Sequence, residues 1–139
     1  MVHKELPHIK LLKTKKVLLA EDNKINQVIA KKLFSKLGYD VDIVNDGAEA
    51  LKTAMSKTYD IIFMDMQMPI MDGVSATQKI IESMPENYPA IIAMTANVLE
   101  SDKQKCFDAG MVEFLAKPID ANKVIEVLQQ FSKTTESSK

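Results

Sequence analysis

Acidic, hydroxyl and amine side chains follow four separate apolar runs in this sequence. Each run is short and bounded by turn residues, which is typical of a strand buried on both faces of a parallel sheet. The residues that follow the runs are Glu21 with Asp22, Asp65, Thr95, and Lys117. Because ligands of open parallel sheets lie beyond the carboxyl ends of the strands, we expect these side chains to share one crevice.

This combination of residue types predicts a site for a divalent cation and a phosphoryl group. Clustered carboxylates repel one another unless a cation lies between them, and oxygen ligands without histidine or cysteine favour Mg²⁺, with Mn²⁺ as its expected substitute. Lys117 and Thr95 suit the remaining oxygens of a phosphoryl group during its transfer. Taken alone, each residue is equally well explained as a turn or capping residue. The interpretation depends on the fact that all of them occur at the same place relative to a predicted strand, directly after its end.

The elements that must position these residues alternate along the chain. The strands are expected at 16–20, 39–44, 61–64, 90–94 and 112–116, and the helices at 24–37, 48–56, 74–84, 99–109 and 120–131. Parallel strands joined by short turns and crossover helices predict an α/β fold, a doubly wound five-stranded parallel sheet with helices on both faces. The first, third and fourth strands contain few polar residues, so we expect them to be central.

The predicted helices have recognisable caps and apolar faces. Asp22 or Asn23 is expected to cap the first helix, and Asp46 the second. Met55 is expected to point inward from the second helix. The first helix is expected to place one face of apolar residues against the sheet, namely Ile25, Val28, Ile29, Leu33 and Leu37.

Length and charge limit the classes of protein that this chain fits. With 139 residues and a formal net charge of -1, it suits one domain and has no field that would attract nucleic acid or a membrane surface. Its single cysteine, Cys106, and the lack of a signal peptide or membrane-length apolar run predict a cytoplasmic location. We expect a linker or mobile arm at 1–15, the folded domain at 16–131 and a disordered tail at 132–139.

The motifs at the strand ends resemble those of receiver domains of two-component response regulators. They are Glu21-Asp22-Asn23, Met64-Asp65-Met66-Gln67-Met68-Pro69 with Met71-Asp72-Gly73, Thr95-Ala96, and Lys117-Pro118. The resemblance covers 16–131 and implies a flavodoxin-like sheet of strand order 2-1-3-4-5. It also implies a phosphorylatable module of two-component or phosphorelay signal transduction, not a turnover enzyme. The stretch 21–27 is similar to receivers carried by hybrid histidine kinases, although a free-standing regulator fits it almost as well.

The resemblance assigns the acidic residues to metal binding and phosphorylation. It makes Asp65 the phosphoacceptor and implies that Asp22, Asp65 and the backbone carbonyl of Gln67 bind Mg²⁺. Glu21 would help through the water shell of the metal. Many members of the family have an aspartate at this position, and the longer glutamate of this chain should weaken direct metal contact without abolishing the site. A cis peptide is implied between Lys117 and Pro118.

The resemblance also assigns residues to phosphoryl binding, switching and tuning. Lys117 and Thr95 would hold the phosphoryl oxygens. Thr95 and Phe114 would form the switch, although Phe114 lacks the hydroxyl of the more usual tyrosine and is otherwise explained as a static core residue. Gln67 and Asn97 would flank the path of the attacking water and tune the lifetime of the phosphoryl group.

A protein carrying a phosphohistidine is the implied donor, either a histidine kinase or a histidine-phosphotransfer domain. Ile25 and Ile29 are candidates for docking a helical donor, with core packing as the alternative explanation. The fourth and fifth predicted helices, with the fifth strand, form a second candidate surface. We expect a monomer, with dimerisation on phosphorylation as an option, and output through protein contacts.

Two other classes of protein use similar features. A phosphohydrolase with an aspartate nucleophile generally has a second acid two residues after the nucleophile, where this chain has Gln67. A flavodoxin-like FMN carrier requires a phosphate-binding loop after the first strand, and that loop is acidic here. Turnover of a phosphate ester or a flavin spectrum would favour these alternatives.

Overall fold

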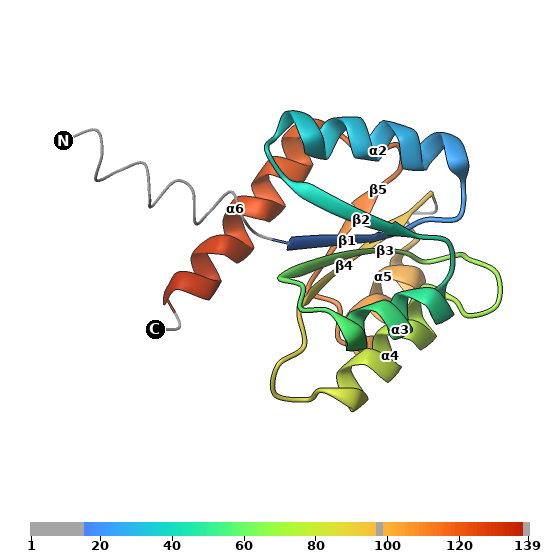
Figure 1. The fold of residues 1–139 in the computed structure, drawn as a ribbon. Coiled ribbons are helices and arrows are strands. Elements are labelled where there is room, and N and C mark those ends of the chain that lie inside the picture. Colours follow the sequence, from blue (N-terminus) through green and yellow to red (C-terminus); the bar gives the residue numbers. More distant parts are fainter. Residues whose placement is uncertain (1–15, 97–98, 138–139) are drawn as a thin grey trace.

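Five parallel strands form the centre of the molecule (Figure 1). The structure is a computed structural model that describes residues 16–96 and 99–137, with side chains described as far as Phe131. The strands are β1 (Lys16–Ala20), β2 (Asp40–Val44), β3 (Ile61–Asp65), β4 (Ala90–Thr95) and β5 (Glu113–Ala116). The helices are α2 (Lys24–Lys36), α3 (Gly47–Ser56), α4 (Gly73–Ser83), α5 (Glu100–Ala109) and α6 (Ala121–Ser137). The order of strands in the sheet is β2-β1-β3-β4-β5, which confirms the expected topology.

Helices cover both faces of the sheet, with α2 and α6 on one face and α3, α4 and α5 on the other (Figure 1). Alternate residues of the central strands enter two separate cores, as the period of two along a strand requires. In β3, for example, Ile62 and Met64 pack on the α3–α4 side, whereas Ile61 and Phe63 pack against α2 and α6. Every residue of β3 is buried, so the central placement predicted from its apolar sequence is confirmed.

Side-chain caps start three of the helices directly after the carboxyl edge of the sheet. Asn23 accepts a hydrogen bond from the backbone N–H of Asn26 and begins α2. Asp46 and Asp72 begin α3 and α4 in the same way. Asn23 is thus the cap of the first predicted helix, and the expected role of Asp46 is confirmed.

The apolar face predicted for the first helix is wrong in its first two turns. Ile25, Val28 and Ile29 are 71%, 54% and 53% exposed, whereas Ala30 and Phe34 are fully buried against the sheet. Residues four apart on an α-helix are offset by about 40° around its axis. A stripe built on that spacing therefore drifts around the helix, and its first members face solvent. Met55, expected to point inward from α3, is also exposed.

The last helix extends beyond the expected end of the folded domain. The backbone of α6 remains helical to Ser137, past residue 131. Residues 1–15, expected to be an arm, lie outside the described residues. None of the helices in 16–96 and 99–137 combines the length and apolar character needed to cross a bilayer.

The edge strand β2 is tied to the loop before β3 by a hydrogen bond. The hydroxyl of Tyr59, which is buried, donates to Oδ2 of Asp42 over 2.6 Å. This bond is the main reason that the pKa of Asp42 is below its ordinary value. Burial of Tyr59, together with the same bond, raises the pKa of its phenol. The ionised form of Asp42 is therefore the form that the fold stabilises.

We expect Tyr59→Phe to lower the free energy of unfolding by about 1 kcal/mol at neutral pH, because it removes this bond. A carboxyl pKa depressed by folding contributes stability above the unfolded pKa, and that contribution is lost as pH falls through the folded value. The difference between wild type and variant should therefore shrink below about pH 4. Urea unfolding at pH 7 and pH 3 measures it, with the exposed Tyr88→Phe as control. A difference that persists undiminished at pH 3 would contradict the assignment.

Candidate functional site

Strand register brings the predicted site residues to one edge of the sheet. Ala20 pairs with Met64, so the next residue of each segment, Glu21 after β1 and Asp65 at the end of β3, lies beside the other. On the other side of β3, Asp65 pairs with Met94, and Thr95 pairs with Ala116. The four strand ends named from the sequence therefore meet at one end of β1, β3, β4 and β5.

The ammonium group of Lys117 joins two buried carboxylates. Its Nζ lies 2.8 Å from Oδ2 of Asp65 and 2.8 Å from Oε1 of Glu21. The backbone N–H of Lys117 donates to the carbonyl of Thr95 over 2.8 Å, which fixes the start of this side chain. Glu21 and Asp65 are only 2% and 4% exposed, so their charges are compensated mainly by this lysine and by nearby backbone amides.

Backbone amides hold the other oxygen of each carboxylate. Gln67 donates its N–H to Oδ1 of Asp65 over 3.1 Å, and Asn23 donates its N–H to Oε2 of Glu21 over 3.0 Å. Gly73 lies against the backbone of Asp65, where a Cβ would collide with the carbonyl oxygen. The glycine in the predicted turn therefore lets α4 begin beside the site.

Three carboxylates form a cluster with the donor set expected for Mg²⁺. One oxygen from each of Glu21, Asp22 and Asp65 lies within 4.8 Å of the others. Asp22 is exposed, whereas the other two are buried, so the cluster opens to water on one side. A small hard cation that binds carboxylate oxygens and retains several waters fits this arrangement. The residues present therefore suit Mg²⁺.

Burial and the neighbouring charges act in opposite directions on Asp65. Burial raises the pKa of Asp65, the bonds from Lys117 and the Gln67 amide lower it, and Glu21 raises it, so that the net shift is upward. The contribution of Lys117 favours the ionised form of Asp65 but is smaller than the effect of burial. Burial by itself would lower the pKa of Lys117, but its bonds to Asp65 and Glu21 raise it overall. A divalent cation among the three carboxylates would favour the ionised form of Asp65.

The residues predicted for switching and tuning occupy different surroundings. Thr95 is buried at the end of β4, and Gln67 is exposed in the loop after β3. Asn97 lies outside the described residues. A hollow of about 250 Å³ beside the site has Gln67 and Thr95 in its lining, together with Asp102 and Lys105 of α5.

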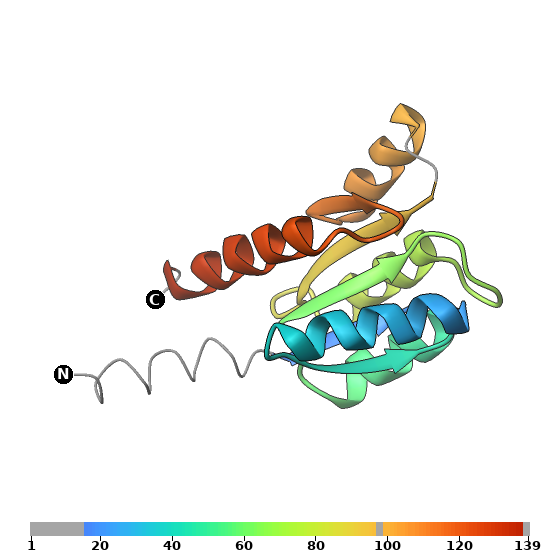
Figure 2. The same ribbon diagram turned by 90° about the horizontal axis from the view of Figure 1, so that it is seen from above.

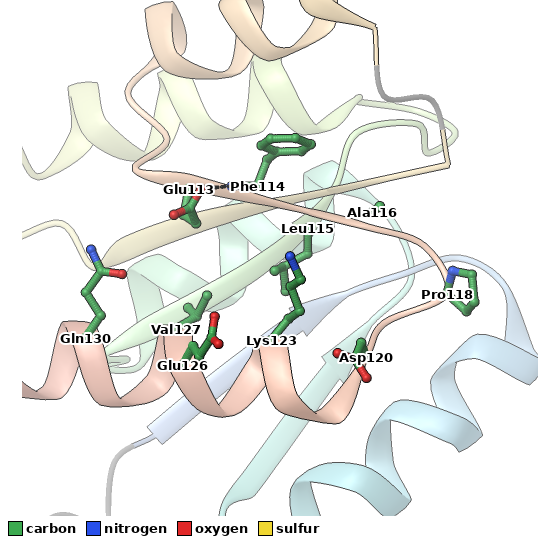
Figure 3. A pocket seen from close by; sticks show the side chains of 10 residues that line it. All are labelled: Glu113, Phe114, Leu115, Ala116, Pro118, Asp120, Lys123, Glu126, Val127 and Gln130. Atoms are coloured by element: carbon green, nitrogen blue, oxygen red, sulfur yellow. Dashed lines mark hydrogen bonds between the residues drawn. The ribbon is translucent and has the colours of Figure 1, made fainter.

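Phe114 is partly buried on β5 and has a charged neighbour that no sequence pattern indicates. Nζ of Lys103, on α5, lies 4.7 Å from the centre of the Phe114 ring. In Figure 3 the ring points to the side of β5 away from α6. The groove of about 470 Å³ between β5 and α6, drawn in that figure, contains none of the acidic cluster and is separate from the site.

Ile70, in the loop between β3 and α4, is a further residue of interest that the motifs of the sequence do not indicate. This residue is 82% exposed and has a positive φ of 70°. The only sequence signal is an apolar residue directly after Pro69 in a turn. The expected cis peptide between Lys117 and Pro118 is present.

Comparison with known proteins identifies the family. The family model for the response regulator receiver domain matches residues 17–129. Hybrid signal transduction histidine kinase L of Dictyostelium discoideum is 44% identical over 126 residues, which cover 85% of this chain and 7% of that kinase. The chain spans 5% to 15% of the length of such curated histidine kinases.

Solved structures agree with this result. The receiver domain of sensor histidine kinase PA1611 from Pseudomonas aeruginosa PAO1 has a magnesium ion coordinated in its active site cleft. It matches with a TM-score of 0.79 and 39% identity, over 85% of this chain and 97% of that chain. A co-crystal structure from Saccharomyces cerevisiae contains the histidine phosphotransfer protein Ypd1 and the receiver domain of Ssk1. It matches with a TM-score of 0.80 and 26% identity, over 85% of this chain and 88% of that chain.

The chain belongs to the family of response regulator receiver domains. It is a receiver of phosphorelay signalling, a phosphorylatable module and not a turnover enzyme. Receiver modules of hybrid histidine kinases are among its homologues. The fold, the strand order and the family resemblance inferred from the sequence are confirmed.

We expect Lys117→Met to lower the free energy of unfolding by roughly 3 kcal/mol without Mg²⁺, because it leaves two buried carboxylates without their ammonium partner. Added Mg²⁺ should stabilise this variant more than the wild type, because a cation then has no competing charge at the site. Urea unfolding with and without Mg²⁺ measures both effects. Lys123→Met, on the exposed part of α6, is the matched control. Equal stabilisation of wild type and Lys117→Met by Mg²⁺ would contradict the expected competition.

Proposed function

We propose that this chain takes a phosphoryl group from a phosphohistidine onto Asp65 and thereby changes a protein-binding surface. The observation that carries the proposal is the position of Asp65. Its carboxylate is buried at the end of β3, bonded to Lys117 and within reach of two further acids. This arrangement supplies a nucleophile, a cation for the transferring group and a donor set for a metal.

In the proposed reaction, a carboxylate oxygen of Asp65 attacks phosphorus in line with the bond to the donor imidazole. The new P–O bond forms as the P–N bond breaks, and the imidazole leaves with the electron pair and takes up a proton. The product is an acyl phosphate. Lys117 already contacts Asp65 and can move from the carboxylate to an oxygen of the bound phosphoryl group. Thr95 would hold another of these oxygens.

The metal site is proposed to consist of Asp22, Asp65 and the backbone carbonyl of Gln67, with Glu21 acting through bound water. When Mg²⁺ is bound, it neutralises part of the charge on the transferring oxygens. Support comes from the carboxylate cluster and from the magnesium ion in the PA1611 receiver domain. The buried position of Glu21, with one oxygen on Lys117, favours indirect contact for this residue.

The switch is proposed to begin at Thr95 and to end at Phe114. Phosphoryl oxygens would draw Thr95 inward, and the ring of Phe114 would move into the space released, which shifts an existing equilibrium between two surfaces. The partial burial of Phe114 and the position of Lys103 over its ring make this residue sensitive to movement of α5 against β5. The surface of α5, β5 and α6 is therefore the candidate for output.

The proposed donor is a histidine kinase or a histidine-phosphotransfer domain. The receiver domain in the similar Ssk1 structure is bound to the phosphotransfer protein Ypd1. In this chain Ile25 and Ile29 are exposed near the start of α2, beside the acidic crevice, so their availability favours docking over core packing. We further propose that the module is monomeric before phosphorylation and acts in the cytoplasm, as one part of a longer kinase or as a separate regulator.

We expect Asp65→Asn to abolish labelling by acetyl phosphate and by a phosphorylated protein donor, because the amide is not a nucleophile for this reaction. Radioactive or Phos-tag gel assays, with and without EDTA, measure the label. Asp108→Asn, at an exposed position of α5, is the control and should label normally. Label retained by Asp65→Asn would refute the assignment.

The proposed switch is tested by NMR of the labelled wild type. Signals of Thr95 and Phe114 that stay in place on labelling would contradict the switch.

Gln67 and Asn97 are proposed to tune the lifetime of the acyl phosphate, because both positions flank the expected path of the attacking water. Gln67 is exposed and its backbone already contacts Asp65. We expect Gln67→Ala and Asn97→Ala to change the half-life of the phosphoryl group, measured by loss of label after the donor is removed. Half-lives equal to that of the wild type in both variants would exclude this role.

A further inference from the structure

Ile70 has a backbone conformation that its side chain disfavours. Its φ is 70°, the only positive φ of a non-glycine residue among the described residues. Across it, Met71 donates its N–H to the carbonyl of Pro69 over 2.7 Å, which closes a three-residue turn. Three-residue turns with a positive φ at the centre are rare and strained. For a β-branched residue this region of backbone space is a true outlier, whereas glycine and asparagine enter it readily.

Packing against the described part of the chain does not explain the choice of isoleucine. The residue is 82% exposed, more than any other large apolar residue described. Burial of its side chain therefore contributes little to offset the strain, and an exposed apolar side chain brings no benefit in water. Positions that break local rules without a gain in the folded state are characteristic of functional surfaces.

The loop that contains Ile70 lies at the reactive edge of the sheet. Figures 1 and 2 show the loop after β3 and the start of α2 at the same end of the molecule, beyond the carboxyl ends of the strands. Asp65 is only 4% exposed, so an imidazole that reaches it must enter the crevice, and the surface of the donor protein must then contact the rim. Ile29 of α2 lines a hollow together with Glu21 and Lys117. Ile25 lies one helical turn before it, and Ile70 lies on the loop between β3 and α4.

We propose that Ile70 is a second apolar anchor for the protein that donates the phosphoryl group, a helical domain with apolar side chains around its phosphohistidine. The inference rests on the proposed function, since it adds a contact on the loop after β3 to the one made by α2. The strained turn holds the side chain out into solvent, where a partner can bury it. Because the anchors on both elements are uncharged isoleucines, the recognition is hydrophobic and depends little on salt.

The test compares a protein donor with a small donor. Ile70→Asn suits the positive φ and removes the apolar contact, and Ile70→Leu keeps an apolar side chain of the same size. With phosphorylated Ypd1 as the probe, the measurement is the rate of single-turnover phosphotransfer at increasing receiver concentration. We expect Ile70→Asn to raise the half-saturating receiver concentration at least tenfold with little change in the maximal rate, and Ile70→Leu to remain within threefold of wild type. Ile25→Asp should raise the half-saturating concentration as well. Labelling by acetyl phosphate should change less than twofold for Ile70→Asn, and thermal unfolding should show that the variant is folded.

The matched control is Met55→Asn, which removes an exposed apolar side chain from α3, outside the rim. An unchanged half-saturating concentration with phosphorylated Ypd1 in Ile70→Asn would overturn the proposal, and so would an equal increase in Ile70→Leu or in Met55→Asn. A wild-type chain that takes label from neither donor would instead refute the proposed function. Wild type labelled by acetyl phosphate but not by phosphorylated Ypd1 would count against the anchor and leave Asp65 as phosphoacceptor.

Discussion

The ammonium group of Lys117, placed between the carboxylates of Glu21 and Asp65, is the interaction on which the site depends. Two carboxylates buried side by side are stable only with compensating charge, because each loses its hydration. Here Nζ lies 2.8 Å from both. The lysine reaches them from β5, across β4, since its backbone is bonded to Thr95. The charge balance of the site therefore depends on the strand order and the register of the sheet.

Lys117 neutralises only part of the negative charge at the site, and the remaining charge determines which groups the site can bind. Glu21, Asp22 and Asp65 carry three formal negative charges and Lys117 one positive charge, so the group has a net charge of -3 + 1 = -2 when all four are ionised. Such a cluster attracts a divalent cation and, without one, repels a phosphoryl group. Binding of the metal and arrival of the phosphoryl group are thus linked through the same four side chains.

The sequence was sufficient to predict features that depend on the succession of elements along the chain and on local turn chemistry. Asp65 and Thr95 could be placed together because parallel strands end at the same edge, whatever the details of packing. The cap at Asp46 could be predicted for a similar reason, since its side chain bonds to a backbone amide only three residues away. The pairing of Lys117 with Glu21 spans most of the chain, and only its approximate location could be inferred.

The sequence did not predict how each helix is rotated about its own axis or which backbone dihedral angles single residues adopt. The apolar spacing in α2 is compatible with two orientations, and the one that buries Ala30 and Phe34 leaves Ile25 and Ile29 in water. No pattern indicates that Ile70 has a positive φ, because that angle results from closure of the loop between Asp65 and α4. Both failures occur on the rim of the crevice. Folding specifies the buried charges at its centre, whereas the exposed isoleucines around it are not required by the fold, and binding of a partner explains why they are apolar.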